Sequence, residues 1–381
     1  MAVVAPNRDA APNGERSRGR SGRGVEVSPE ARIVQLTDQL HAVLEGAISS
    51  PGRWHQLLDT SATLWRYSGG NVALLMAQRE MLGLQPPTLV AGYREWQRHG
   101  RTVFKGEHAL WVLAPRTARK DSQLSEATVG DKVDGRGAEP PVADSGTDRK
   151  IVGWRGQAVF DVSQTEGEPI YVPRPGVGMT NIPAGLWEAL VEAAERRRFV
   201  VDVSDNQRSM SSGYTDFADR RIQVGAWLGR EDAAAVLVHE LGHVYLHGPH
   251  DKVGKLYGSG LQHRGLAEVE AESVAYTVLR AHGIDRGSQS SSYLAGWADR
   301  VIDVERAGKS GTGEPAGHLT RMDVARSTLG RVTATCRDIL EITRPAGAGG
   351  KLTALQSSLV DVGLDSRPMA VAPRPAALRA N

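Results

Sequence analysis

The segment VLVHELGHVYLH, which begins at Val236, contains the five-residue pattern His-Glu-x-x-His. Residues four apart in a helix lie one turn apart on the same face, so His239 and His243 can offer two imidazole nitrogens to one metal ion. Glu240 lies about 100° around the helix, where its carboxylate can reach a water at the metal as a general base. Gly242 costs such a helix about 1 kcal/mol relative to Ala, which the close approach of another element would explain. The pattern predicts a hydrolytic centre for Zn²⁺, with another divalent metal such as Mn²⁺ as an alternative.

A catalytic zinc centre needs a third protein ligand and an open position for water. The segment RGLAEVEAESVAYTVLRAHG supplies Glu268 and Glu272, which lie four residues apart on an otherwise apolar helical face. We predict that Glu268 is the third ligand and that Glu272 orients a ligand histidine, although the two roles could be exchanged. Glu270 points nearly the opposite way and is interpreted as a solvated charge, and His247 as a cation at the helix end. The alternative to a metal centre is a pair of core histidines with satisfied hydrogen bonds.

Hydrophobic periodicity predicts an α+β chain with two domains that position these residues. The second domain, residues 182–343, contains an expected helix in LWEALVEAAERRR, strands in FVVDV and RRIQV, the two helices above and a late helix near Met322. The first domain, residues 29–165, contains three amphipathic helices, the third with Asn71 as its N-cap and Gly83 as its stop, followed by short strands. Residues 117–150 are predicted to form a flexible insert, and residues 1–28 and 344–381 disordered tails.

Composition and charge narrow the class of protein. Hydrophobic residues make up 40% of the 381 residues, which is enough for a packed core, and the one cysteine, Cys336, excludes a disulfide framework. No apolar run approaches the roughly 20 residues that span a bilayer, and no signal-peptide segment is recognised at the N-terminus, so we expect a cytoplasmic protein without a membrane partner. Residues 53–119 carry nine Arg/Lys against four Asp/Glu, a net charge of +5, which favours a polyanionic partner for this region.

Aromatic and basic residues alternate in this front region. Proteins bind single-stranded DNA by stacking bases on aromatic rings while cations follow the phosphates, so the alternation indicates such a surface. The alternative is that most of these aromatic rings belong to the core. The alternating residues are Trp65, Arg66, Tyr67, Tyr93, Arg94, Trp96, Arg98, Arg101, Phe104 and Lys105.

The segments WRYSGGNVALLMAQ and VAGYREWQRHGRTVFKGEHALWVLAP resemble the N-terminal domain of ArdC-like antirestriction proteins. The residues that carry this resemblance are Tyr67, Ser68, Asn71, Gln78, Trp96, Gly100, Arg101, Lys105, Gly106, Glu107, Ala114 and Pro115. The pair Gly69-Gly70 departs from the family's pattern by one residue, and FDVSQTEG is similar to the segment between the family's two domains. The resemblance covers about residues 50–115 and 151–300.

The resemblance implies a single-stranded-DNA-binding first domain and a zincin-like metallopeptidase second domain, which is also similar to ImmA/IrrE-type peptidases. The candidate DNA contacts are Trp65, Arg66, Tyr67, Asn71, Trp96, Arg101 and Lys105. The hypothesis is a DNA-associated or antirestriction zinc peptidase with an unidentified protein substrate. The alternatives are a non-catalytic DNA-binding antirestriction protein with a structural metal, and a regulatory peptidase that cleaves a repressor.

Overall fold

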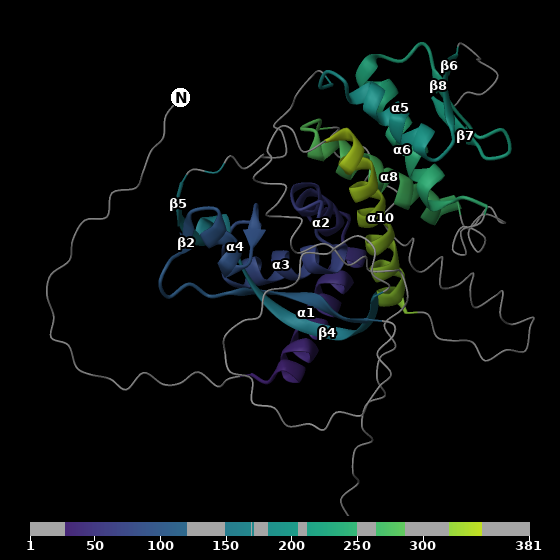
Figure 1. Ribbon diagram of the computed structural model, residues 1–381. Coiled ribbons are helices and arrows are strands. Elements are labelled where there is room, and N and C mark those ends of the chain that lie inside the picture. Colours follow the sequence, from purple (N-terminus) through teal and green to yellow (C-terminus); the bar gives the residue numbers. More distant parts are fainter. Residues whose placement is uncertain are drawn as a thin grey trace, which may run out of the picture.

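The computed structural model describes residues 27–119, 149–168, 170, 182–204, 212–249, 264–285 and 320–344. These residues form a mixed arrangement of helices and sheets, as the α+β prediction requires (Figure 1). Most of the two predicted tails and residues 120–148 of the predicted insert lie outside the described residues. Within the described ranges, no helix combines the length and the apolarity that crossing a bilayer needs.

The front half begins with three helices: α1 (Pro29–Ser49), α2 (Pro51–Thr63) and α3 (Gly69–Met81). Ser28 caps α1 by accepting a hydrogen bond from the backbone N–H of Ala31. The predicted cap of α3 was wrong, because Ser68 accepts from the backbone N–H of Asn71 and the helix therefore starts earlier. This cap frees the Asn71 side chain for a contact with the sheet. Gly83, with a φ of +66°, follows the end of α3, as expected for a helix stop.

The front half also contains two small sheets and one short helix. Their elements are β1 (Val90–Ala91), α4 (Tyr93–Arg98), β2 (Arg101–Val103), β3 (Leu110–Arg119), β4 (Arg149–Asp161) and β5 (Thr165–Gly167). The first sheet has the antiparallel order β1-β4-β3, and β2 pairs with β5. Because β3 pairs with β4 as far as Arg119 and Arg149, both ends of the predicted 117–150 insert are strand, which corrects its boundaries.

The back half places a three-stranded sheet beside a group of helices. Its elements are α5 (Leu186–Arg196), β6 (Val200–Ser204), β7 (Gly213–Asp216), β8 (Arg221–Gly225), α6 (Arg230–Leu246), α8 (Arg264–Ala281) and α10 (Arg321–Thr343). β8 lies between a parallel β6 and an antiparallel β7. The sequence-based assignment missed β7, because its four residues lie in a string rich in turn-forming residues.

One continuous hydrophobic core joins the two halves. α8 packs against α2, α6 and α10, and α10 also packs against α1 and α3, so helices from both halves surround α8 (Figure 1). The contact between the halves includes polar bonds, such as the 3.0 Å hydrogen bond from Trp54 Nε1 to Ser273 Oγ. Gly69, at the start of α3, lies against α10, where an added Cβ would be 2.6 Å from Leu329. The helix that carries the candidate carboxylates therefore has neighbours on several sides.

Candidate metal centre

Close packing of α6 against α8 brings the candidate ligands together. Gly242 lies at the contact, and an added Cβ would be 2.8 Å from the Cα of Ala271. The expected close approach at Gly242 is therefore present. Because the obstructing atom belongs to the backbone of α8, the two helices could not approach this closely with any larger residue at this position.

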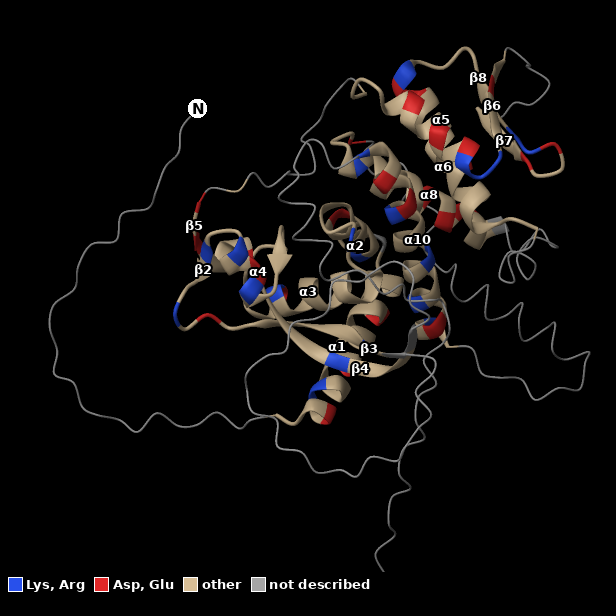
Figure 2. Cartoon of the chain, in the orientation of Figure 1, with Lys and Arg blue, Asp and Glu red and all other residues tan. Residues whose placement is uncertain are grey.

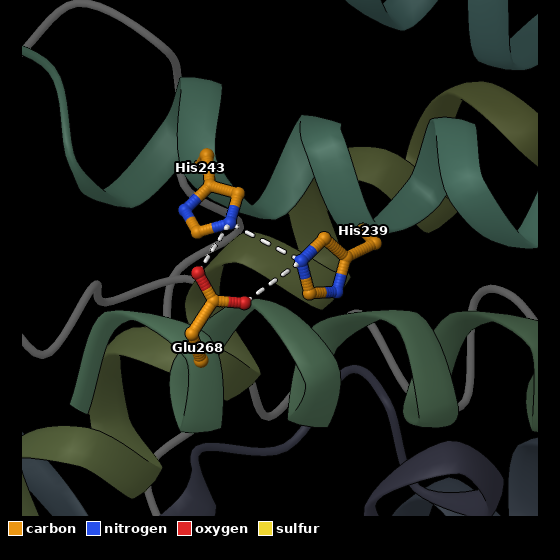
Figure 3. Close-up of side chains that lie close together, drawn as sticks. All are labelled: His239, His243 and Glu268. Carbon is orange, nitrogen blue, oxygen red and sulfur yellow. Dashed lines mark hydrogen bonds and ion pairs between the residues drawn. The ribbon is translucent and has the colours of Figure 1, made fainter. Parts of the chain in front are cut away.

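Three donor groups converge between the two helices (Figure 3). The Nε2 atoms of His239 and His243 lie 3.2 Å apart. Glu268 places one carboxylate oxygen 3.3 Å from His239 Nε2 and the other 3.7 Å from His243 Nε2. Ligands about 2.0–2.1 Å from a tetrahedral zinc ion lie roughly 3.3 Å from one another, so these separations suit one shared ion. The structure thus brings together the three residues that were predicted as ligands.

Hydrogen bonds on the outer nitrogens direct both imidazoles toward this centre. His239 Nδ1 lies 3.1 Å from a carboxylate oxygen of Glu272, which can accept its proton and leave Nε2 facing inward. His243 Nδ1 lies 2.9 Å from Nδ1 of His247. Glu272 therefore occupies the orienting position that was predicted for it, and His247 occupies a corresponding position beside the other histidine.

The carboxylates and imidazoles of this cluster shift one another's pKa values. Burial alone would lower the pKa of His239, but hydrogen bonds to Glu268 and Glu272 outweigh it and raise the pKa to about 10. Burial, together with the charge of the neighbouring His239, lowers the pKa of His243 to about 3. The hydrogen bond from His239 lowers the pKa of Glu268. The raised pKa favours the protonated form of His239, and a metal ion at these donors would compete with that proton.

Glu240 lies outside this ligand set and is held by β7. Its carboxylate is buried, and Thr215 Oγ1 donates a 2.7 Å hydrogen bond to Oε2. Burial raises the pKa of Glu240, while the hydrogen bond from Thr215 opposes the rise. At Gly213 an added Cβ would lie 2.4 Å from Val236, so the strand needs glycine here to approach α6. Sequence reasoning missed Thr215 because it missed β7.

A second charged cluster lies farther along the same two helices and corrects two interpretations. Glu270 is not a solvated charge, because its side chain is 1% exposed and forms an ion pair with Arg331 of α10, with 3.0 Å between Arg331 Nε and Glu270 Oε1. His247 does follow the end of α6, but its Nε2 lies 3.0 Å from Glu270 Oε2. The periodicity argument assumed that α8 has a solvent face opposite Glu268, whereas α10 packs against α8.

Most of the predicted DNA-stacking rings lie in the interior. Trp65, Tyr67 and Trp96 are all buried. The Tyr67 hydroxyl donates to the backbone oxygen of Val90 at 2.7 Å, and Trp96 Nε1 donates to that of Phe160 at 3.0 Å. A base could not stack on these rings as they are placed, so the stacking role predicted for the three residues is corrected to a core role.

Asn71 and Arg101 also serve the fold of the front half. The Asn71 amide both donates to and accepts from the backbone of Leu113 at about 3 Å, which ties α3 to β3. Arg101 is nearly buried and donates to Thr165 and to backbone oxygens that follow β5. These bonds give both side chains a structural role, and their predicted DNA contacts stay predictions. Arg66 stays partly exposed with its guanidinium 4.3 Å above the Trp65 ring, and Lys105 is exposed.

Two aromatic–cation pairs do reach the surface of the front half. Tyr93 is 47% exposed at the start of α4, and Phe104 is 41% exposed after β2. The next residue in each case, Arg94 or Lys105, is an exposed cation, and Figure 2 shows blue Lys and Arg segments, interspersed with red acidic ones, near α4 and β2. The sequence did contain a signal for these surface residues: each is an aromatic residue directly followed by a cation. Each pair lies at a helix start or a turn, where a buried side chain is less expected.

Comparison with known proteins covers the front half best. Two similar solved structures are of the antirestriction protein ArdC from the R388 plasmid. The metal-free one has 19% sequence identity and a TM-score of 0.42, and the match covers 73% of this chain and 85% of that chain. For the Mn(II)-bound one the values are 17%, 0.41, 73% and 86%. No curated protein matches. Residues 32–143 match the family model of the N-terminal domain of anti-restriction factor ArdC, so this part of the chain is similar to that domain.

Proposed function

We propose that the back half is a divalent-metal-dependent hydrolase of the peptidase class. His239, His243 and Glu268 would hold the ion, with Zn²⁺ or Mn²⁺ as candidates for this set of imidazole and carboxylate donors. The observation that carries the proposal is the separate carboxylate of Glu240, which is buried, lies near enough to His239 and Glu268 to interact with their charges, and accepts a hydrogen bond from Thr215. A purely structural metal site has no need for that fourth group.

In this proposal, different residues of the chain have separate roles in peptide hydrolysis. A bound divalent ion supplies Lewis-acid polarisation of the substrate carbonyl. Glu240 acts as the general base that accepts a proton from the attacking water. Thr215 positions its carboxylate, and Glu272 orients the imidazole of His239. Because Thr215 holds one Glu240 oxygen, the other oxygen remains for the proton transfer.

The decisive variant is Glu240→Gln, which keeps the shape of the side chain and removes the base. We expect it to bind Zn²⁺ and Mn²⁺ like the unaltered protein while losing cleavage of dye-labelled casein by about 100-fold or more. Glu231→Gln makes the same chemical change in the first turn of α6 and serves as the matched control. Full cleavage by Glu240→Gln would overturn the peptidase proposal and favour a non-catalytic metal site.

A second function, binding of single-stranded DNA, is favoured by the match of residues 32–143 and by the exposed pairs on the front half. In this proposal Tyr93 and Phe104 stack on bases, while Arg94 and Lys105 contact phosphates. Tethering a peptidase to DNA would restrict cleavage to proteins that are met there.

Fluorescence anisotropy with a labelled single-stranded oligonucleotide tests this surface. We expect Tyr93→Ala and Phe104→Ala each to weaken binding by roughly 5- to 150-fold, since stacking contributes about 1–3 kcal/mol per base. Lys105→Ala should lower the slope of log affinity against log salt by about 0.7. Trp227→Ala, which removes a half-exposed ring from the back half, is the control. Unchanged affinity in all three front variants would exclude this surface.

A further inference from the structure

We propose that a buried chain of hydrogen bonds determines which nitrogen of His243 carries its proton. This chain, the Glu270 relay, consists of Arg331, Glu270 and His247, and it ends at the outer nitrogen of His243. It rests on the proposed metal centre, because its effect is to keep the lone pair of His243 Nε2 directed toward the other donors.

The relay begins with a fixed cation. Arg331 donates from Nε to Glu270 Oε1 at 3.0 Å and from its terminal nitrogen to Oε2 at 3.2 Å. The same terminal nitrogen donates to the backbone oxygen of Leu246, the last residue of α6, at 2.6 Å. Arg331 therefore holds Glu270 in the interior by three hydrogen bonds, and both carboxylate oxygens act as acceptors.

His247 connects Glu270 to His243. Its Nε2 lies 3.0 Å from Glu270 Oε2, an acceptor, so Nε2 must be the protonated nitrogen. Arg331 already balances the charge of Glu270, so the relay takes His247 in its neutral form. In this neutral form the lone pair of His247 lies on Nδ1.

The last bond fixes His243. The two Nδ1 atoms of His243 and His247 lie 2.9 Å apart, so one must donate and the other accept. Because His247 Nδ1 is the acceptor, His243 carries its proton on Nδ1 and keeps the lone pair on Nε2. That lone pair faces His239 Nε2 and Glu268. The other neutral tautomer would turn a proton toward the metal position.

The relay also connects the metal centre to the front half. Arg331 belongs to α10, and two residues farther along this helix Thr333 Oγ1 accepts a 3.2 Å hydrogen bond from the backbone N–H of Gly69. The helix that supplies the fixed cation therefore also packs against the start of α3. A metal centre built by α6 and α8 alone would lack this third helix and its cation.

The substitution Glu270→Gln tests the direction of the relay with a side chain of nearly the same shape. With the amide oxygen kept on Arg331 Nε, which makes the shortest of its bonds to Glu270 at Oε1, the NH₂ would stand at the Oε2 position, face His247 Nε2 and reverse both following bonds. We expect the His243 proton to move from Nδ1 to Nε2 in the metal-free protein, observed by ¹⁵N-histidine NMR. Affinity for Zn²⁺, measured against a competing chelator, should fall about 10- to 100-fold. Glu272→Gln, a change beside His239 Nδ1 rather than beside the relay, should leave the His243 tautomer unchanged.

A pair of variants at His247 keeps the test decisive if Glu270→Gln fails to fold. In His247→Gln the amide can donate to Glu270 and accept from His243, so both tautomer and affinity should be retained. His247→Leu removes the acceptor and should lose affinity by a similar 10- to 100-fold. Unaltered affinity in His247→Leu, or an unaltered tautomer in folded Glu270→Gln, would overturn the relay. Failure of the unaltered protein to bind metal would instead overturn the proposed function, and the tautomer would still report on the relay.

Discussion

The same two helices carry two histidine–glutamate clusters that differ in surroundings rather than in residue type. In the metal centre, Glu268 is 47% exposed and, in the described part of the chain, pairs with histidines alone. In the relay, Glu270 is 1% exposed and pairs with Arg331 as well as His247. A carboxylate that is paired with an Arg serves the fold. A carboxylate that is paired with histidines, which can lose their protons, remains available to a metal ion.

The third helix creates this difference. α10 packs along α8 and places Arg331 against Glu270, on the side of α8 away from Glu268. Breaking one cluster should therefore change mainly stability, and breaking the other mainly metal affinity. The predictions below separate the two outcomes, beginning with the largest effect.

Arg331→Met should cause the largest loss of stability. It leaves the Glu270 carboxylate buried without its cation, which costs about 3–5 kcal/mol. Urea unfolding of the metal-free protein at neutral pH measures this loss. Arg53→Met is the control, because the Arg53–Glu80 pair is about half exposed and should contribute less than about 1 kcal/mol. If Arg331→Met unfolds like the control, the buried pair does not have the role assigned to it.

Glu268→Ala should lower the metal affinity strongly and change the stability little. We expect metal affinity to fall by more than about 100-fold, beyond the range for residues that only orient ligands. The free energy of unfolding of the metal-free protein should change by less than about 1 kcal/mol, since the Glu268 side chain is half exposed. Metal analysis after dialysis, together with urea unfolding, checks both values. Full metal occupancy in Glu268→Ala would place the third ligand elsewhere.

Gly242→Ala should affect both properties to an intermediate degree. The added methyl group meets the backbone of Ala271, so α6 and α8 must separate, at a cost of about 1–3 kcal/mol. Separation also spreads the donors, which come from both helices, and should reduce metal affinity. Gly330→Ala on α10 is the matched control, because nothing lies within 4 Å of its added Cβ, and it should be stabilising by up to about 1 kcal/mol. Equal stability of the two variants would exclude the close approach as a constraint.

Local helical geometry was enough to predict much of the candidate metal centre. The spacing of His239 and His243, and of Glu268 and Glu272, determines which side chains share a face, and the structure places all four at the contact between α6 and α8. The three front helices were also predictable from hydrophobic periodicity. Both inferences needed only the periodicity of one helix at a time.

Residues whose role depends on packing between distant segments were not predictable in this way. Glu270 became buried because α10, which begins 51 residues later at Arg321, covers that side of α8. Trp96 and Tyr67 looked like a binding surface, but the small front half uses them as its core. Thr215 depends on a strand of four residues that local patterns did not reveal. In each case tertiary contacts, rather than local propensity, decided the role.

The smallest effect on metal affinity is expected for Glu272→Gln, which can be compared directly with Glu270→Gln. Glu272 accepts from His239 Nδ1, and its side chain is 41% exposed, so a replacement amide has more room to turn here than at the buried position of Glu270. The Gln oxygen can turn toward His239 and preserve its tautomer. We expect Zn²⁺ affinity to fall less than about tenfold, against 10- to 100-fold for Glu270→Gln. Competitive chelator titrations of the two variants make the comparison. If Glu272→Gln had the larger effect, orientation by a permanently fixed carboxylate would not be what distinguishes the two clusters.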